Sequence, residues 1–178
     1  MVSTVDNLLN LGLLRQPRTV VFGPGQRALL PRLIAPLGTT VLVCTDERMA
    51  TSAEYAGLRE SLEQADIRVH LFDRVQPDLP RSDVMALQAS LADERVDAVI
   101  GLGGGSCLDM AKVAALMLTH RGDVRDYFGE NVVPGPVIPI ITVPTTAGTG
   151  AEVSCIGVVY DEDGQPVRQE RPDVVVGG

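Results

Sequence analysis

The sequence predicts an α/β fold in which a mostly parallel sheet carries helices on both faces. Short runs rich in Val, Ile and Leu, typical of buried strands, alternate with longer segments whose apolar residues recur at helical spacing. Each such run ends in residues that favour turns, such as glycine, proline or aspartate. Because strands that alternate with helices form right-handed βαβ units, neighbouring strands are expected to be parallel.

The elements follow this alternation along the chain. The predicted strands are 19–22, 40–44, 67–72, 96–100 and 137–143, and the predicted helices are 26–37, 54–65, 82–95 and 106–120. We expect Pro31 to lie in the first turns of its helix and Pro36 to end it. Ser82 and Ser106 are predicted N-caps, because a serine side chain accepts a hydrogen bond from a free amide of the first turn.

The chain is predicted to form one domain, 1–178, with a loosely attached arm at 1–17. Two β-rich runs flank Asp161–Gly164, which predicts a C-terminal β-hairpin, and a short tail completes the segment 154–178.

Composition limits the class of protein. Aromatic residues make up 3% of the 178 residues and tryptophan is missing, so the core must be aliphatic. The net charge of −8 excludes a nucleic acid as partner, because no basic face is available. Three widely spaced cysteines without a C-x-x-C pair indicate free thiols in a reducing compartment. No apolar stretch approaches membrane-spanning length, so we expect a cytoplasmic protein without a membrane partner.

A glycine-rich turn joins the predicted strand 96–100 to the helix that follows. Gly103, Gly104 and Gly105 precede Ser106, and they leave no Cβ in the way of a ligand. The helix N-terminus offers unpaired amides and the positive end of its dipole, which suit a phosphate. A tight turn without a ligand is the alternative interpretation.

Two further features fall at carboxyl ends of predicted strands, where parallel sheets bind ligands. Asp46 follows the strand 40–44 and could accept both ribose hydroxyls of an adenosine, although a helix N-cap or a solvated loop residue is the alternative. Its order relative to the glycines differs from the usual G-x-G-x-x-G fingerprint. Thr145, Thr146 and Thr149 follow the strand 137–143 and offer hydroxyls to a pyrophosphate or nicotinamide, or else pack in a small-residue loop.

The remaining polar residues give weaker signals. Asp109 lies in the first turn of the helix after the glycines, where it either contributes to the ligand site or complements the helix dipole. Lys112 reads as a surface lysine. Cys107 stands where a thiol pKa can fall, but a small buried filler is favoured since no histidine is near in sequence. His70 and His120 form neither a metal site nor a catalytic pair.

The segments Gly103–Lys112 and Pro144–Glu152 closely resemble the two signatures of the iron-dependent (group III) alcohol dehydrogenase family, and Phe22–Gly25 and Thr45–Asp46 match its earlier landmarks. The resemblance covers nearly all of the chain. It implies a Rossmann-like N-terminal domain that binds NAD(P), with the pyrophosphate at Gly103–Ser106. It also implies that Asp46 holds the adenosine ribose and favours NAD.

According to the same resemblance, Thr145, Thr146 and Thr149 flank the phosphates and the nicotinamide. Ala151 stands where many members have serine.

The resemblance also implies a metal that this sequence does not account for. In the family, an all-helical second domain supplies histidines that hold Fe²⁺ or Zn²⁺ together with one aspartate. That domain is absent from the sequence, and so are its ligands, so we assign no catalytic or metal-binding residue. The expected function is the NAD-binding half of a metal-dependent alcohol dehydrogenase, inactive by itself.

Two alternatives remain open. One is a catalytically inactive nucleotide-binding or oligomerisation module, a homo-oligomer formed through apolar surface. The other is a relative from the same superfold, such as a glycerol dehydrogenase or a dehydroquinate-synthase-like enzyme.

Overall fold

The computed structural model describes most of the chain and divides it into helices and strands around one main sheet. The described residues are 17–91, 94–120, 122–129, 132–148, 150–161, 166–170 and 174–177. The predicted arm, apart from Pro17, lies outside these ranges. So do Thr149 and most of the predicted hairpin turn.

The described strands form a six-stranded sheet and a separate two-stranded sheet. The strands are β1 (Thr19–Phe22), β2 (Thr40–Cys44), β3 (Arg68–Phe72), β4 (Ala98–Gly103), β5 (Ile140–Pro144), β6 (Ile156–Tyr160), β7 (Pro166–Glu170) and β8 (Val174–Gly177). The large sheet has the order β1-β8-β5-β4-β2-β3, and all of its pairs are parallel. The predicted parallel sheet is thus confirmed.

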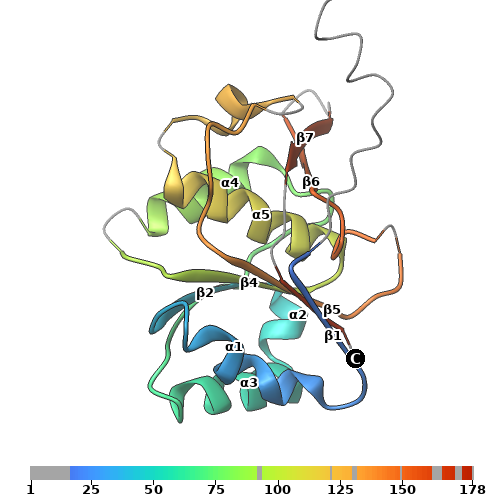
Figure 1. Ribbon diagram of the computed structural model, residues 1–178. Coiled ribbons are helices and arrows are strands. Elements are labelled where there is room, and N and C mark those ends of the chain that lie inside the picture. Colours follow the sequence, from blue (N-terminus) through green and yellow to red (C-terminus); the bar gives the residue numbers. More distant parts are fainter. Residues whose placement is uncertain are drawn as a thin grey trace, which may run out of the picture.

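The helices cover both faces of the large sheet (Figure 1). They are η2 (Gln26–Leu29), α1 (Leu30–Ile34), α2 (Glu47–Ala50), α3 (Ala53–Glu63), α4 (Arg81–Ser90), α5 (Gly105–Thr119) and η3 (Val124–Tyr127). Two apolar clusters result. One joins α1 and α3 to the sheet, and the other joins α4 and α5 to the opposite face. Both clusters are largely aliphatic, as the composition predicts.

The C-terminal segment contains the predicted hairpin. β6 and β7 pair antiparallel, with Ile156 opposite Glu170, and lie beside α5 above the sheet (Figure 1). Beyond the hairpin, β8 enters the large sheet between β1 and β5. The tail therefore supplies an interior strand.

Both predicted serine N-caps are wrong. Pro80 is the N-cap of α4: its backbone is extended and its carbonyl accepts from the amide of Asp83, so the helix begins at Arg81 and includes Ser82. Gly104 is the N-cap of α5, its carbonyl accepting from the amides of Cys107 and Leu108, so that Ser106 already lies within the first turn. The predicted extension of α4 to residue 95 is also wrong, because its apolar spacing stops at Leu91.

Candidate functional site

The carboxyl edge of the sheet carries a cavity of about 430 Å³. Its lining comes from the segments that follow β2, β3 and β4, and consists of Asp46, Glu47, Arg48, Val75, Gln76, Pro77, Gly104, Gly105, Ser106 and Cys107. Asp46 and the glycine turn, which are far apart in sequence, therefore line the same cavity. A second hollow of about 570 Å³ adjoins it and shares Glu47, Val75 and Gln76.

The glycine turn has a backbone conformation that requires glycine. Gly103 has φ +142°, and a Cβ there would lie 2.8 Å from Cys107 Sγ. Within the described part of the chain, the amides of Gly105 and Ser106 donate to no acceptor. Both amides lie at the N-terminus of α5, which is 15 residues long and adds the positive end of its dipole. These amides and the helix dipole make the turn chemically able to accept hydrogen-bonding anions.

Asp46 uses its two carboxylate oxygens differently. Oδ1 accepts from the amide of Met49 at 2.8 Å and caps α2, whereas Oδ2 lies 3.9 Å from Cys107 Sγ, on the side of the glycine turn. The buried hydroxyl of Thr45 donates to the carbonyl of Leu102 at 2.7 Å and ties the end of β2 to β4. The N-cap interpretation is therefore confirmed, and the thiol of Cys107 donates to the second oxygen.

The threonine loop after β5 borders the same turn. The amide of Thr145 donates to the carbonyl of Gly103 at 3.0 Å, and the Thr146 side chain lies 3.5 Å from where a Cβ on Gly104 would stand. Both threonines are exposed, although neither is among the residues that line the cavity. Thr149 lies outside the described residues.

The third wall of the cavity, residues 75–79, is the part that the sequence interpretation missed. Asp78 and Leu79 have φ of +61° and +43°, values that side chains other than glycine rarely adopt. The buried carboxylate of Asp83 accepts from the backbone amide of Gln76 at 2.9 Å and from its side-chain amide at 3.0 Å. The available signal was position, because this segment also follows the carboxyl end of a strand, β3.

Cys107 is a buried filler, as favoured from the sequence. Burial raises the pKa of its thiol to about 12, with the neighbouring Asp46 charge adding to the effect. Burial likewise raises the pKa of Cys44. Cys107 lines the cavity as a neutral thiol, so it is not a nucleophile at neutral pH.

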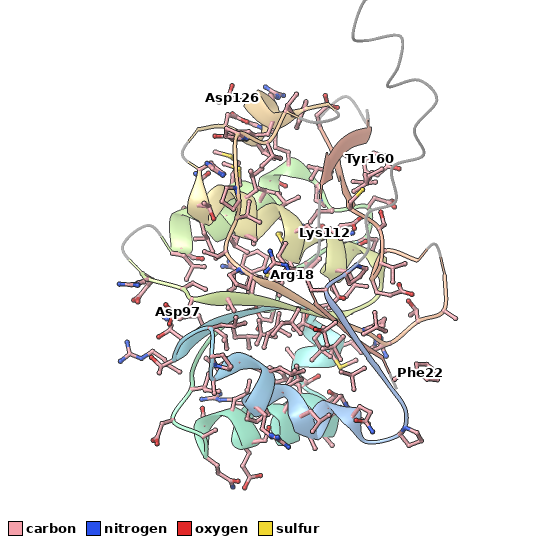
Figure 2. All side chains as sticks on the ribbon, viewed as in Figure 1. Arg18, Phe22, Asp97, Lys112, Asp126 and Tyr160 are labelled. Atoms are coloured by element: carbon pink, nitrogen blue, oxygen red, sulfur yellow. The ribbon has the colours of Figure 1, made fainter. Side chains whose placement is uncertain are left out.

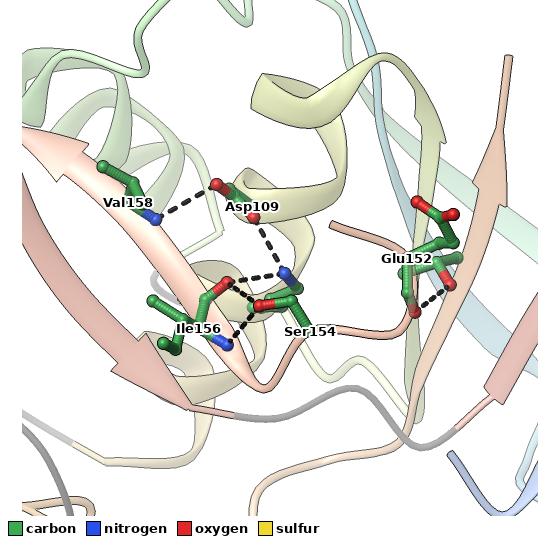
Figure 3. Close-up of polar contacts among 7 residues, drawn as sticks. Asp109, Glu152, Ser154, Ile156 and Val158 are labelled. Atoms are coloured by element: carbon green, nitrogen blue, oxygen red, sulfur yellow. Dashed lines mark hydrogen bonds and ion pairs between the residues drawn. The ribbon is translucent and has the colours of Figure 1, made fainter. Parts of the chain in front are cut away.

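Asp109 and Lys112 interact with the hairpin (Figure 3). Asp109 Oδ1 lies 2.8 Å from Lys112 Nζ, and Oδ2 accepts from the amide of Val158 at 3.1 Å. Lys112 Nζ also donates to the carbonyl of Ile156 at 2.7 Å. The prediction of a surface lysine is wrong, since the hairpin covers this face of α5 and leaves Lys112 1% exposed. Burial lowers the pKa of Lys112, although the Asp109 charge opposes the shift.

The described residues do not fit a metal ion. No group of three or more His, Cys, Asp or Glu side chains in the described ranges could hold one. His70 Nε2 lies 3.6 Å from a carboxylate oxygen of Glu94, and the His120 ring lies 6.3 Å from that of Tyr127. None of the described helices combines the length and apolar character needed to cross a bilayer.

Comparisons with known proteins agree with this geometry. The family model for iron-containing alcohol dehydrogenase matches residues 17–177. The chain is 34% identical over 124 residues to sulfoacetaldehyde reductase from Bilophila wadsworthia, covering 70% of this chain and 32% of that protein.

Two solved structures are also similar. The crystal structure of a 1,3-propanediol oxidoreductase has a TM-score of 0.89 and 27% identity, and the match covers 94% of this chain and 46% of that one. Sulfoacetaldehyde reductase from Bifidobacterium kashiwanohense, in complex with NAD⁺, has a TM-score of 0.80 and 28% identity, covering 93% and 46%. The matches thus span from about a third to just under half of the length of these relatives.

Proposed function

The chain belongs to the iron-containing alcohol dehydrogenase family, and on that premise we propose that it is the NAD-binding part of an NAD-dependent, metal-assisted alcohol dehydrogenase. The observation that carries this proposal is the shared cavity, in which Asp46 stands opposite the glycine turn. In the complete enzyme, the reaction would interconvert a small alcohol and an aldehyde or ketone.

The lining of the cavity offers groups that suit the two polar parts of a dinucleotide, its diphosphate and its ribose. The diphosphate would accept hydrogen bonds from the amides of Gly105 and Ser106, and Arg48 lines the same cavity in an otherwise acidic chain. Asp46 Oδ2 would accept from the ribose hydroxyls and repel a 2′-phosphate, which favours NAD over NADP. NAD supplies the hydride acceptor when it is bound.

The threonine loop would flank the phosphates and the nicotinamide. Thr145 and Thr146 border Gly103 and Gly104, which supports that role. The role of Thr149 rests on the family signature alone. For Asp109 we propose an indirect role, because the chain itself engages both of its carboxylate oxygens.

Since the described residues do not fit Fe²⁺ or Zn²⁺, no step through a metal is assigned to them. We therefore expect this chain to bind NAD(H) without turning over an alcohol.

The test is a titration with NADH followed by fluorescence, using wild type and Gly104→Ala. A Cβ on Gly104 meets only the Thr146 side chain, at 3.5 Å and 3.7 Å, so the variant should fold while carrying a methyl group on the phosphate wall. We expect saturable binding to wild type and an affinity about tenfold lower for the variant, equivalent to about 1.4 kcal/mol.

Gly57→Ala is the matched control for this titration. A Cβ on Gly57, within α3, meets nothing within 4 Å, so NADH affinity should not change. If wild type shows no saturable response at millimolar NADH, or if Gly104→Ala binds as wild type does, the cavity is not the dinucleotide site.

A second candidate function is that of an oligomerisation module, and the edge of the sheet supports it. β1 is an edge strand of the described sheet, with Val20 58% and Phe22 87% exposed, and Phe22 points away from the body of the molecule (Figure 2). We propose that two copies associate through this strand. Light scattering should give twice the monomer mass for wild type and the monomer mass for Phe22→Asp, and a wild-type monomer at high concentration would exclude this association.

The free cysteines support a reducing location. Cys44, Cys107 and Cys155 are all unpaired, and the first two are buried. We propose that the protein is cytoplasmic.

A further inference from the structure

The buried pair Asp109–Lys112 is matched to the backbone of β6. The Lys112 ammonium donates to the carbonyl of Ile156, and the Asp109 carboxylate accepts from the amide of Val158 (Figure 3). The Lys112 side chain is 0% exposed and that of Asp109 is 14% exposed. Because both charged groups are also bonded to each other, neither is left buried without a partner.

These contacts lie on the outer edge of β6, since its inner edge pairs with β7. Outward-facing groups recur at every second residue of a strand, and the next outward group is the amide of Tyr160. That amide donates to the carbonyl of Leu79 at 3.1 Å. Three successive outward positions of β6 are thus held, two of them by α5 and one by the segment after β3.

Gly157 lets the strand come close enough to α5 for these bonds. A Cβ on Gly157 would lie 3.3 Å from Val113 Cγ2 and 3.4 Å from the backbone oxygen of Asp109. A methyl group at this position would require the Val113 side chain or the strand to shift by a few tenths of an ångström. The packing of Gly157 and the polar contacts therefore favour the same position of β6.

The third contact connects the hairpin to the cavity. Leu79 ends the wall segment, whose Val75, Gln76 and Pro77 line the cavity. Asp78 and Leu79 have left-handed backbone conformations, which persist only where the surroundings hold them. Asp83 fixes the Gln76 end of the segment, and the amide of Tyr160 fixes the Leu79 end.

We propose that Asp109 and Lys112 are positioning residues for the dinucleotide. They fix the register of β6 on α5, and through Tyr160 they hold the wall segment 75–79 in the position that dinucleotide binding requires. This inference rests on the proposed function of the cavity. A shift of β6 by one residue would turn its side chains to the opposite face and would place Ile156 or Val158 where Gly157 now packs against Val113. The pair thus fixes the register of the strand as well as neutralising a buried charge.

The first experiment compares Tyr160→Pro with Tyr160→Ala. Both variants lose the phenol ring, but only the proline lacks the amide that donates to Leu79, and the Asp109–Lys112 pair is untouched. We expect Tyr160→Pro to bind NADH about tenfold more weakly than Tyr160→Ala, as for a lost hydrogen bond of ordinary strength. Equal affinities for NADH would overturn the proposal.

The second experiment tests the pair itself. Under conditions in which the variant is fully folded, Lys112→Met should weaken NADH binding by about tenfold. The control is Leu62→Ala, which removes a buried side chain on the opposite face of the sheet. At a comparable loss of stability, this control should leave the NADH affinity within about twofold. Reversing the pair (Asp109→Lys with Lys112→Asp) keeps opposite charges but faces each backbone group with the wrong partner, so it should not restore binding. Restored binding would show that charge neutralisation alone matters.

The two proposals fail in distinguishable ways. If wild type does not bind NADH, the proposed function is wrong. In that case, hydrogen exchange at the amides of Val158 and Tyr160 still tests whether the Asp109–Lys112 pair holds β6 in place. Lys112→Met should accelerate exchange at both positions, and Leu62→Ala at neither. Wild-type exchange rates in Lys112→Met would show that the pair does not hold β6 in place.

Discussion

Replacing Asp46 separates the two roles of its carboxylate. Oδ1 caps α2 through the amide of Met49, and Oδ2 faces the glycine turn, where a ribose is expected. Asp46→Asn keeps a carbonyl oxygen for the cap but loses the charge, whereas Asp46→Ala loses both. Asparagine caps helices about as well as aspartate, so the free energy of unfolding should fall only for Asp46→Ala, by about 1 kcal/mol.

The expected effect on cofactor affinity follows from hydrogen-bond strengths. A hydrogen bond to a charged acceptor is worth about 1.5–3 kcal/mol and one to a neutral acceptor about 1 kcal/mol. Asp46→Asn should therefore bind NADH about tenfold more weakly, and Asp46→Ala about 100-fold more weakly. For NADPH, Asp46→Asn should instead improve binding, because the repulsion between the carboxylate and the 2′-phosphate disappears.

Fluorescence titrations with NADH and NADPH measure the affinities, and urea unfolding of each variant measures the free energies of unfolding. The reasoning is refuted if Asp46→Asn binds both cofactors as wild type does. Asp46 would then be only the cap of α2.

Three further predictions concern the framework of the site. Gly103→Ala should destabilise the fold by about 1–3 kcal/mol in urea unfolding, because φ is +142° there and the new methyl group meets Cys107 Sγ; an unchanged midpoint would contradict the backbone assignment. Burial raises the pKa of Cys107 to about 12 in the folded state, above the ordinary thiol value of 9.0, so its contribution to stability is complete below pH 9 and is lost as the pH rises toward 12. Between pH 8 and pH 10, Cys107→Ala should therefore lose about 1.4 kcal/mol less stability than wild type in urea titrations, and parallel pH profiles would argue against a buried thiol. Thr45→Val should cost about 1–2 kcal/mol, since it leaves the carbonyl of Leu102 buried without its donor, and a stability equal to that of wild type would show that this bond contributes nothing.

Much of the fold was predictable because local sequence patterns indicate its strands, helices and turns. β-Branched runs such as Thr40–Cys44 form strands, and the turn residues between β6 and β7 predict the hairpin. The convergence of Asp46 with the glycine turn followed from topology alone, since parallel strands end at one edge. Helix starts were less predictable, because Pro80 and Gly104 begin helices at positions where a neighbouring serine looked like the cap.

Contacts made by distant segments could not be predicted from local pattern. The helical spacing of α5 leaves Lys112 on its polar side. The side chain is buried because β6, which is distant in sequence, packs over it. The wall segment has no glycine to signal the left-handed conformations of Asp78 and Leu79, and its bonds to Asp83 and Tyr160 come from outside the segment. Tertiary contacts override local preference at both places.

The position of β8 determines when the sheet can be completed during synthesis. Thr19 lies opposite Val174, so the first described strand to leave the ribosome finds its neighbour in the described sheet only after the last one has been made. Until then, the backbone groups that β1 and β5 later share with β8 stay open to other chains. We expect nascent chains that stop before Val174 to leave these groups unpaired and to depend on chaperones.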